Sequence, residues 1–205
     1  MLVDNENMKK RYQILSMDAV HNGFLKLKSY LLQHECFEGG WCPRVRRERV
    51  EGNHAVSVLL YDPREDAVVL IEQFRIGAMG HADDPWLLET VGGYMEEGEA
   101  AEEVARRETR EETGCELLAL EFIGRFFTTP GWCGERISLY CGRVDSTGAA
   151  GVHGLDHEGE DILVRVMSRE VALKELFRRA NSTSIVVGLQ WLSQHWQELQ
   201  QRWGS

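Results

Sequence analysis

The chain has 205 residues, of which 43% are hydrophobic and 27% are charged, as is usual for a globular protein with one domain or two small ones. Its formal net charge of −10 argues against nucleic acids and anionic membranes as partners, because both attract basic surfaces. The first residues lack the apolar core of a signal peptide, and no apolar run is long enough to span a bilayer. We therefore expect a cytoplasmic protein that binds neither nucleic acid nor membrane.

The cysteines point to the same compartment. Their number is odd and none of them forms a C-x-x-C pair, so the sequence favours neither a disulfide framework nor a zinc site. Reduced thiols are the expectation for all five: Cys36, Cys42, Cys115, Cys133 and Cys141.

The first half of the chain is typical of β-structure. Residues 11–33 alternate apolar and polar side chains around a turn at His21-Asn22-Gly23, which predicts a β-hairpin. A turn is also expected at residues 62–66, where Asp, Pro and charged residues interrupt the apolar pattern. The other predicted strands are 44–51, 55–61, 67–73, 117–127, 137–144 and 162–167.

Three helices are predicted. Residues 100–108 favour a helix, and Gly114 is a natural stop. Ser168 can cap a short helix through Arg179. The segment 182–203 is amphipathic, so we expect a helix that docks on a core through one face: Ile185, Leu189, Leu192, Trp196 and Leu199.

One segment carries residues at a restrictive spacing. It reads G-x5-E-x7-R-E-x-x-E-E-x-G, with Gly93, Glu99, Arg107, Glu108, Glu111, Glu112 and Gly114 at the named positions. At 3.6 residues per turn, Glu108 and Glu112 share a helix face, with Glu111 beside them. A solvated acidic face would explain glutamates alone. Like charges at this spacing destabilise a helix, however, and a hard divalent cation such as Mg²⁺ would compensate them.

This spacing resembles the signature of the Nudix hydrolases. Two positions depart from it, because Thr109 and Cys115 stand where the family has larger aliphatic residues. The resemblance implies an α/β fold, a Nudix α/β/α sandwich with a mixed sheet, and it implies bound divalent metal ions.

Stretches outside the signature resemble the bacterial ADP-ribose pyrophosphatases within that family. They are 45–48, 71–75, 85–89 and 128–131, and the likeness runs from about Gly23 to the C-terminus. It implies an N-terminal antiparallel β extension, residues 1–52, which is exchanged between the subunits of a homodimer. Residues 53–205 would then form the Nudix hydrolase domain.

The resemblance also implies a metal site and a general base. The metal residues would be Gly92, through its carbonyl, with Glu108, Glu112, Glu160 and Glu111. We expect Mg²⁺, with Mn²⁺ as the alternative, at roughly two or three ions per site. The predicted catalytic base is Glu158, in the glycine-rich loop 146–159. His157 is a rival base because an unperturbed histidine side chain titrates near neutral pH.

Substrate contacts are carried over position by position. Guanidinium groups suit phosphate and ribose oxygens, and an aromatic face can stack on adenine. The predicted substrate-binding residues are Phe24, Leu25, Arg47, Glu48, Arg75, Thr129, Gly131 and Glu135. Trp132 and Cys133 are bulkier than this branch leads us to expect, so the sugar specificity stays open.

The activity implied by the resemblance is hydrolysis of the pyrophosphate of ADP-ribose to AMP and ribose 5-phosphate. Another nucleoside diphosphate sugar, such as GDP-mannose or ADP-glucose, is the alternative substrate. A second alternative is a non-catalytic Nudix domain that senses ADP-ribose. Such regulators typically carry a DNA-binding module, and neither a helix-turn-helix extension nor a basic patch is evident in the sequence.

Overall fold

The computed structural model divides the chain into two compact units. One contains Met1–Gly52 and Thr129–Glu135, and the other contains Asn53–Thr128 and Arg136–Ser205. The structure describes residues 10–80, 84–155, 157 and 159–204. Among these residues, no helix is both long enough and apolar enough to cross a membrane. The predicted boundary between residues 52 and 53 stays a prediction.

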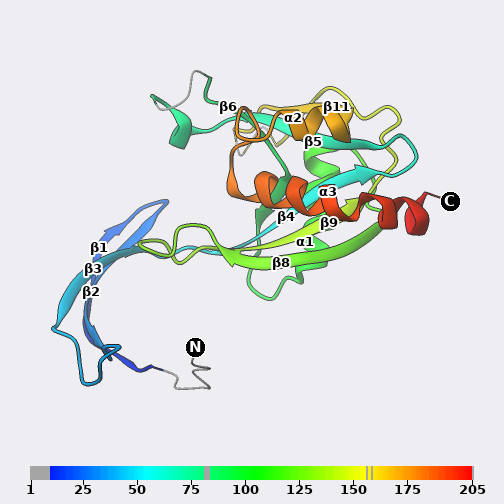
Figure 1. Ribbon diagram of the computed structural model, residues 1–205. Helices are drawn as coiled ribbons and strands as arrows, with labels where there is room; N and C mark the ends of the chain where they lie inside the picture. Colours follow the sequence, from blue (N-terminus) through cyan, green and yellow to red (C-terminus); the bar gives the residue numbers. More distant parts are fainter. Residues whose placement is uncertain (1–9, 81–83, 156, 158, 205) are drawn as a thin grey trace, which may run out of the picture. The chain divides into compact units, whose positions relative to one another are not determined.

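The N-terminal unit is built on a three-stranded antiparallel sheet in the order β1-β2-β3. The strands are β1 (Tyr12–Asn22), β2 (Lys26–His34) and β3 (Val45–Val50) (Figure 1). The predicted hairpin is confirmed, and its turn lies at residues 23–25, slightly later than expected. All of β1 is exposed, whereas Tyr30 of β2 is buried.

The segment 129–135 joins the end of β3. Val50 N–H donates to the Trp132 carbonyl at 2.8 Å, and Gly134 N–H donates to the Val50 carbonyl at 3.0 Å. Gly52 lies against Glu135, and a Cβ on Gly52 would be 2.3 Å from the Glu135 nitrogen. The close approach requires glycine here.

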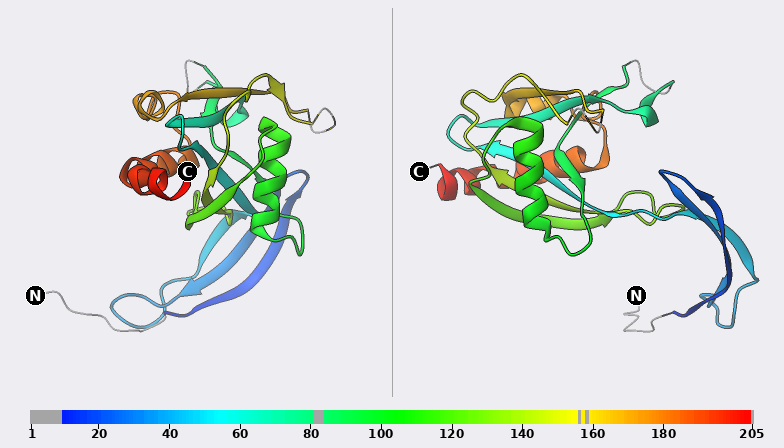
Figure 2. Two further views of the ribbon diagram at one scale, coloured as in Figure 1. Left: turned by 90° about the vertical axis from the view of Figure 1, so that its right-hand side faces the viewer. Right: turned by 180° about the vertical axis from the view of Figure 1, so that it is seen from behind.

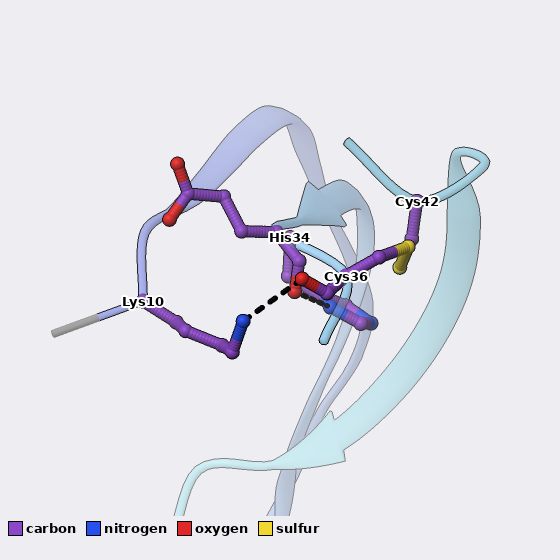
Figure 3. The surroundings of a disulfide bond; sticks show 5 residues. Lys10, His34, Cys36 and Cys42 are labelled. Atoms are coloured by element: carbon purple, nitrogen blue, oxygen red, sulfur yellow. Dashed lines mark hydrogen bonds between the residues drawn. A yellow bond between two sulfur atoms is a disulfide. The ribbon is translucent and has the colours of Figure 1, made fainter. Parts of the chain in front are cut away.

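The prediction of reduced thiols is wrong for two of the cysteines. Cys36 and Cys42 form a disulfide whose Cα atoms are 5.2 Å apart (Figure 3). A turn after β2 brings them together: Cys36 N–H donates to the Gly40 carbonyl at 2.9 Å, and Cys42 N–H donates to the His34 carbonyl at 2.8 Å. Cysteine spacing alone does not reveal such a turn. Lys10 Nζ donates to the Cys36 carbonyl at 2.8 Å. The free cysteines are Cys115, Cys133 and Cys141.

The larger unit contains a mixed sheet in the order β10-β11-β5-β4-β9-β8, with β6 paired to β5 and β7 paired to β4. Strands β4 and β9 run parallel, and the other neighbours are antiparallel. The strands are β4 (His54–Asp62), β5 (Ala67–Phe74), β6 (Trp86–Glu89), β7 (Val91–Tyr94), β8 (Ala119–Phe127), β9 (Arg136–Arg143), β10 (Val152–His153) and β11 (Ile162–Ser168).

Helices cover both faces of this sheet (Figure 2). Helix α1 (Ala101–Thr113) packs on one face, and α2 (Arg169–Lys174) and α3 (Thr183–Trp203) pack on the other. Alternation along β4 explains the two cores, because successive side chains point to opposite faces. Val56, Val58 and Leu60 pack in the α1 cluster, and Leu59 and Tyr61 pack in the α3 cluster. The predicted α/β/α sandwich is confirmed.

The elements differ from the prediction in four places. Strands β6 and β7 have four residues each and occupy the stretch that leads into the glutamate motif, where no strand is predicted. Helix α2 ends at Lys174 instead of Arg179, and Phe177 beyond it has a left-handed φ of 61°. The loop 146–159 contains the short strand β10. A short 3₁₀ helix, η1 (Ile76–Ala78), follows β5.

Candidate active site

Helix α1 presents its glutamates to strand β7. The helix ends where predicted, because Gly114 adopts φ 71° and its N–H donates to the Arg110 carbonyl at 2.9 Å. Gly93 of β7 faces Glu108, and a Cβ on Gly93 would be 1.9 Å from Glu108 Oε1. Only glycine therefore leaves room for the Glu108 carboxylate in this position.

Glu112 is the most deeply placed of these carboxylates. Its residue is 2% exposed, and its Oε2 accepts a hydrogen bond from Gly92 N–H at 2.9 Å. Burial raises the pKa of Glu112 well above its ordinary value, the Gly92 hydrogen bond opposes this rise, and the charges of Glu108 and Glu160 add to it. Cationic charge near Glu112 would therefore stabilise the site.

The pKa of Glu108 is also raised above its ordinary value. Burial raises its pKa, the pairing with Arg107 opposes the rise, and Glu111 and Glu160 add to it. A buried and a partly buried carboxylate one turn apart thus both resist ionisation.

Arg107 holds three motif glutamates together. Its Nη1 donates to Glu108 Oε1 at 2.7 Å and to Glu111 Oε2 at 3.2 Å, and its Nε donates to Glu99 Oε1 at 3.3 Å. Glu99 also accepts from Glu96 N–H at 3.1 Å, which fixes the turn before the helix. The arginine of the motif therefore orients carboxylates, and Glu99 anchors it.

Glu160 lies between β10 and β11, two residues before β11 begins. Its Oε2 accepts from Leu155 N–H at 3.1 Å. Gly154 has φ 105°, and a Cβ there would be 2.6 Å from Glu160 Cβ, so the loop closes tightly on this residue. The predicted base Glu158 lies outside the described residues. His157 is exposed.

Arg75 is the predicted substrate residue that belongs to this unit. It follows β5, and its Nε donates to Glu89 Oε2 at 2.5 Å. Its positive charge also lowers the pKa of Glu112. Arg75 is therefore close enough for its charge to act on the Glu112 carboxylate, and the hydrogen bond to Glu89 orients the Arg75 guanidinium.

The other predicted substrate residues belong to the N-terminal unit. Phe24 and Leu25 lie at the exposed tip of the β1–β2 hairpin, and Phe24 is 95% exposed. Arg47 and Glu48 are in β3, and the Arg47 Nη1 donates to the neighbouring Arg46 carbonyl. Thr129, Gly131 and Glu135 are in the segment beside β3. Their contacts with substrate stay predictions.

The donor chemistry of the site fits a divalent metal ion. Carboxylate oxygens are the ligands that Mg²⁺ and Mn²⁺ prefer, and the mutual repulsion of Glu108, Glu112 and Glu160 would be relieved by a cation. The side chains do not form a complete metal-binding site, because no three His, Cys, Asp or Glu groups among the described residues lie close enough together to hold a metal ion. Arg107 supplies part of the compensating charge instead.

Ser57 and Thr90 are buried polar residues that the sequence interpretation misses. Ser57 Oγ is 2.6 Å from Thr90 Oγ1 and donates to the Val91 carbonyl at 3.3 Å. Ser57 also pairs in register with Gly92, so this hydroxyl pair fastens β7 behind the carboxylates. A serine inside the apolar stretch AVSVLL is the sequence signal that could have found it.

Residues 53–185 match the NUDIX domain family. The chain belongs to the Nudix family. Its ADP-ribose pyrophosphatase relatives include one from Escherichia coli (strain K12), 42% identical over 196 residues that cover 95% of this chain and 94% of the relative. One from Haemophilus influenzae is 42% identical over 195 residues, covering 93% and 90%. A GDP-mannose pyrophosphatase from Cronobacter sakazakii is 29% identical over 167 residues, covering 79% and 86%.

A solved structure has the same fold. The crystal structure of an ADP compounds hydrolase superposes with a TM-score of 0.69 over 90% of this chain and 96% of that chain, at 18% identity. The likeness concerns the fold alone.

Proposed function

We infer that this Nudix protein hydrolyses the pyrophosphate of ADP-ribose to AMP and ribose 5-phosphate. The observation that carries this inference is the glutamate pair on α1, Glu112 buried and Glu108 partly buried, which lies against the two glycines of β7. The relatives named ADP-ribose pyrophosphatase, which match nearly the whole chain, support the choice of substrate.

We propose that Glu108, Glu112, Glu160 and the Gly92 carbonyl hold the divalent ions, with Glu111 beside them. When bound, such ions acidify water and neutralise phosphate oxygens. Arg107 keeps Glu108 and Glu111 directed toward one region. Mg²⁺ is the expected ion and Mn²⁺ the alternative, with the number of ions to be measured.

Proton abstraction needs a group that is not itself a metal ligand, because a metal-bound carboxylate is a weak base. Glu158 is the proposed base, and His157 is its rival. Both are in the loop that leads to Glu160, so a base there could act on a water beside the metal ligands.

Arginine and aromatic side chains supply the proposed substrate contacts. Arg75 is positioned for an anionic substrate, because its charge already acts on Glu112. The remaining proposed contacts are Phe24, Leu25, Arg47, Glu48, Thr129, Gly131 and Glu135.

We further propose that two chains form a homodimer through the N-terminal sheet. Strand β1 exposes Tyr12, Ile14, Met17 and Val20, and an apolar strand without cover is typical of a protein interface. A cytoplasmic location remains a prediction. The Cys36–Cys42 disulfide bears on it, because disulfides are rare in a reducing cytoplasm.

A substrate panel tests the proposed function. ADP-ribose, ADP-glucose, GDP-mannose, NADH and diadenosine polyphosphates are each incubated with the chain and Mg²⁺, and phosphate is measured after phosphatase treatment. We expect ADP-ribose to give the highest kcat/KM and chelation by EDTA to abolish turnover. A higher kcat/KM for GDP-mannose would reject ADP-ribose as the preferred substrate and keep the reaction class.

A further inference from the structure

Two basic side chains contact one buried serine on the α1 face of the large sheet, and a third lies two residues before the serine on the same strand. Register places them: His54 of β4 is opposite Arg136 of the parallel strand β9, and Arg125 of β8 is opposite Ser138 of β9. Arg136 and Ser138 are two residues apart and so point to the same face. Tyr140, the next residue on that face, packs in the α1 cluster.

Ser138 contacts two of these basic side chains. It is fully buried, and its Oγ accepts a hydrogen bond from Arg125 Nε at 3.0 Å. His54 Nε2 is 3.0 Å from the same oxygen. Burial lowers the pKa of His54, and the nearby charges of Arg125 and Arg136 lower it further. The group therefore concentrates positive charge around a fixed hydroxyl.

This charge stands out within an acidic chain. Among the ion pairs that the described residues of this unit form with one another, none includes Arg125 or Arg136, and the same holds for Arg64, Arg106 and Arg178. The arginines at 75, 107, 110, 165, 169, 179 and 202 are paired with carboxylates. Burial and the charge of Glu102 on α1 raise the pKa of the Tyr140 hydroxyl, and the charge of Arg125 lowers it. Two arginines without a carboxylate in this unit, beside a neutral imidazole, can accept an anion.

The group lies close to the proposed reaction centre. Val56 of β4 pairs with Gly93 on one side and with Ser138 on the other. Two strand spacings therefore separate Ser138 from the glycine that faces Glu108, or roughly 10 Å between Cα atoms. Ser138 therefore lies outside the cluster of Glu108, Glu112 and Glu160, but one nucleotide is long enough to reach from that cluster to Ser138.

We propose that His54, Arg125, Arg136 and Ser138 form a binding site for a phosphate dianion, either free or as a phosphomonoester. Guanidinium groups match the geometry of phosphate oxygens, and the serine fixes one of the two guanidiniums in advance. The site is separate from the carboxylates that would hold metal and does not depend on hydrolysis.

The test uses the full chain without metal, in EDTA and at low salt. Inorganic phosphate, AMP and ribose 5-phosphate are titrated by calorimetry, and the imidazole of His54 is followed by NMR. The variant R125Q/R136Q is compared with R64Q/R178Q, which removes two exposed arginines elsewhere in the same unit. We expect phosphate to raise the pKa of His54 in the wild type, and R125Q/R136Q to weaken phosphate binding by at least roughly tenfold. The control variant should bind as the wild type does.

Each result has a defined meaning. AMP or ribose 5-phosphate binding more tightly than inorganic phosphate would support a site for that phosphomonoester, and equal affinities would support a site for phosphate alone. Equal binding by both double variants, or no response of His54 to any of the three ligands, would overturn the proposal. Because the protein carries no metal in this experiment, loss of ADP-ribose turnover in the substrate panel would leave the titration interpretable. Thermal unfolding followed by circular dichroism checks that both variants fold.

Discussion

Burial is the largest influence on the pKa of Glu112. A carboxylate in the interior is disfavoured in its charged form, and the single turn between Glu108 and Glu112 adds repulsion to the cost of burial. The site therefore reduces the stability of the chain before any cation arrives. A residue proposed to hold metal therefore works against the stability of the metal-free fold.

The substitution Glu112→Gln should separate these two effects. A neutral amide removes the buried charge, and its oxygen can still accept from Gly92 N–H. We expect the free energy of unfolding of the metal-free chain at pH 7 to rise by about 1 kcal/mol or more, and kcat to fall by at least about 10²-fold. Urea denaturation and steady-state kinetics measure the two. Glu97→Gln, on an exposed residue of the preceding turn, should change neither. A less stable metal-free Glu112→Gln would contradict the argument.

The proposed base is tested by Glu158→Gln, which keeps the size of the side chain and removes its basicity. We expect kcat to fall roughly 10²-fold or more, with little change in metal affinity. His157→Gln is the matched comparison in the same loop. If Glu158→Gln turned over normally and His157→Gln did not, the role of base would pass to His157.

Local periodicity explains which parts of the site the sequence predicts. Glu108, Glu111 and Glu112 are neighbours on one helix because of the 3.6-residue repeat, so their grouping follows from spacing alone. The pairing of Arg75 with Glu89 depends on the register between β5 and β6, and the Ser57–Thr90 contact depends on β4 and β7. Such contacts between strands leave no periodic pattern in the sequence.

At the scale of elements, β7 is confined between a strand and a helix. A Cβ on Gly92 would be 2.3 Å from the backbone oxygen of Val56, whereas a Cβ on Gly93 would meet only the end of the Glu108 side chain. Backbone cannot move aside without shifting the strand, but a carboxylate can rotate away. The two adjacent glycines therefore have different roles. Gly92 allows β7 to pack closely against the backbone of β4, and Gly93 leaves room for the Glu108 carboxylate.

Alanine substitutions should reveal this difference. We expect Gly92→Ala to lower the free energy of unfolding by roughly 1–3 kcal/mol. Gly93→Ala should leave stability within about 1 kcal/mol and reduce kcat by at least about tenfold, because it displaces a proposed metal ligand. Gly124→Ala serves as the control, since a Cβ at Gly124 would meet nothing within 4 Å. Equal losses of stability for Gly92→Ala and Gly93→Ala would contradict this reasoning.

In the N-terminal sheet, Glu51 couples stability to pH. Arg49 donates to both of its oxygens at 2.9 Å, and Tyr30 OH donates to Oε1 at 2.7 Å. The Arg49 hydrogen bonds, with a smaller contribution from Tyr30, lower the pKa of Glu51 from 4.5 to about 2. A lowered pKa in the folded state means that the stabilisation is complete above pH 4.5 and is lost as pH falls toward 2.

The corresponding variant is Glu51→Gln. Because the carboxylate is partly exposed, we expect the wild type to exceed the variant by about 1–2 kcal/mol at pH 6, and the difference to vanish near pH 2. Guanidinium denaturation of both chains from pH 6 to pH 2 gives the comparison. Glu38→Gln, in the exposed turn after β2, should show no such pH-dependent difference. A difference that persisted unchanged at pH 2 would rule out ionisation of Glu51 as its origin.

At the scale of the whole molecule, β1 is the strand whose sequence and surroundings disagree. It alternates apolar and polar residues, as a strand with one buried face does, yet every residue of it is exposed in a single chain. The sequence predicts the strand correctly because alternation is local. What covers the strand depends on a second surface, which no local pattern specifies.

A homodimer would resolve the disagreement. We expect size-exclusion chromatography with light scattering to give twice the mass of one chain. The variant I14K/V20K should shift the protein toward the monomer, because lysine at an apolar interface position leaves a charge to be desolvated. Q13K/H21K adds the same charge at polar positions of β1 and should remain dimeric. A wild type that elutes as a monomer at micromolar concentration would reject the dimer.

The segment 129–135 has a consequence for how the protein is made. It hydrogen-bonds to the end of β3, although residues 53–128, which belong to the other unit, lie between Gly52 and Thr129 in the sequence. On the ribosome, the three strands of the N-terminal sheet are made long before this segment, because synthesis runs from the N-terminus, so the N-terminal unit is complete only once Glu135 has been added. Strand β9 follows directly and pairs with β4, which was synthesised long before. The N-terminal unit is therefore completed while the larger unit still lacks the residues after Glu135, and a cut at residue 52 would separate the N-terminal sheet from the segment that hydrogen-bonds to its last strand.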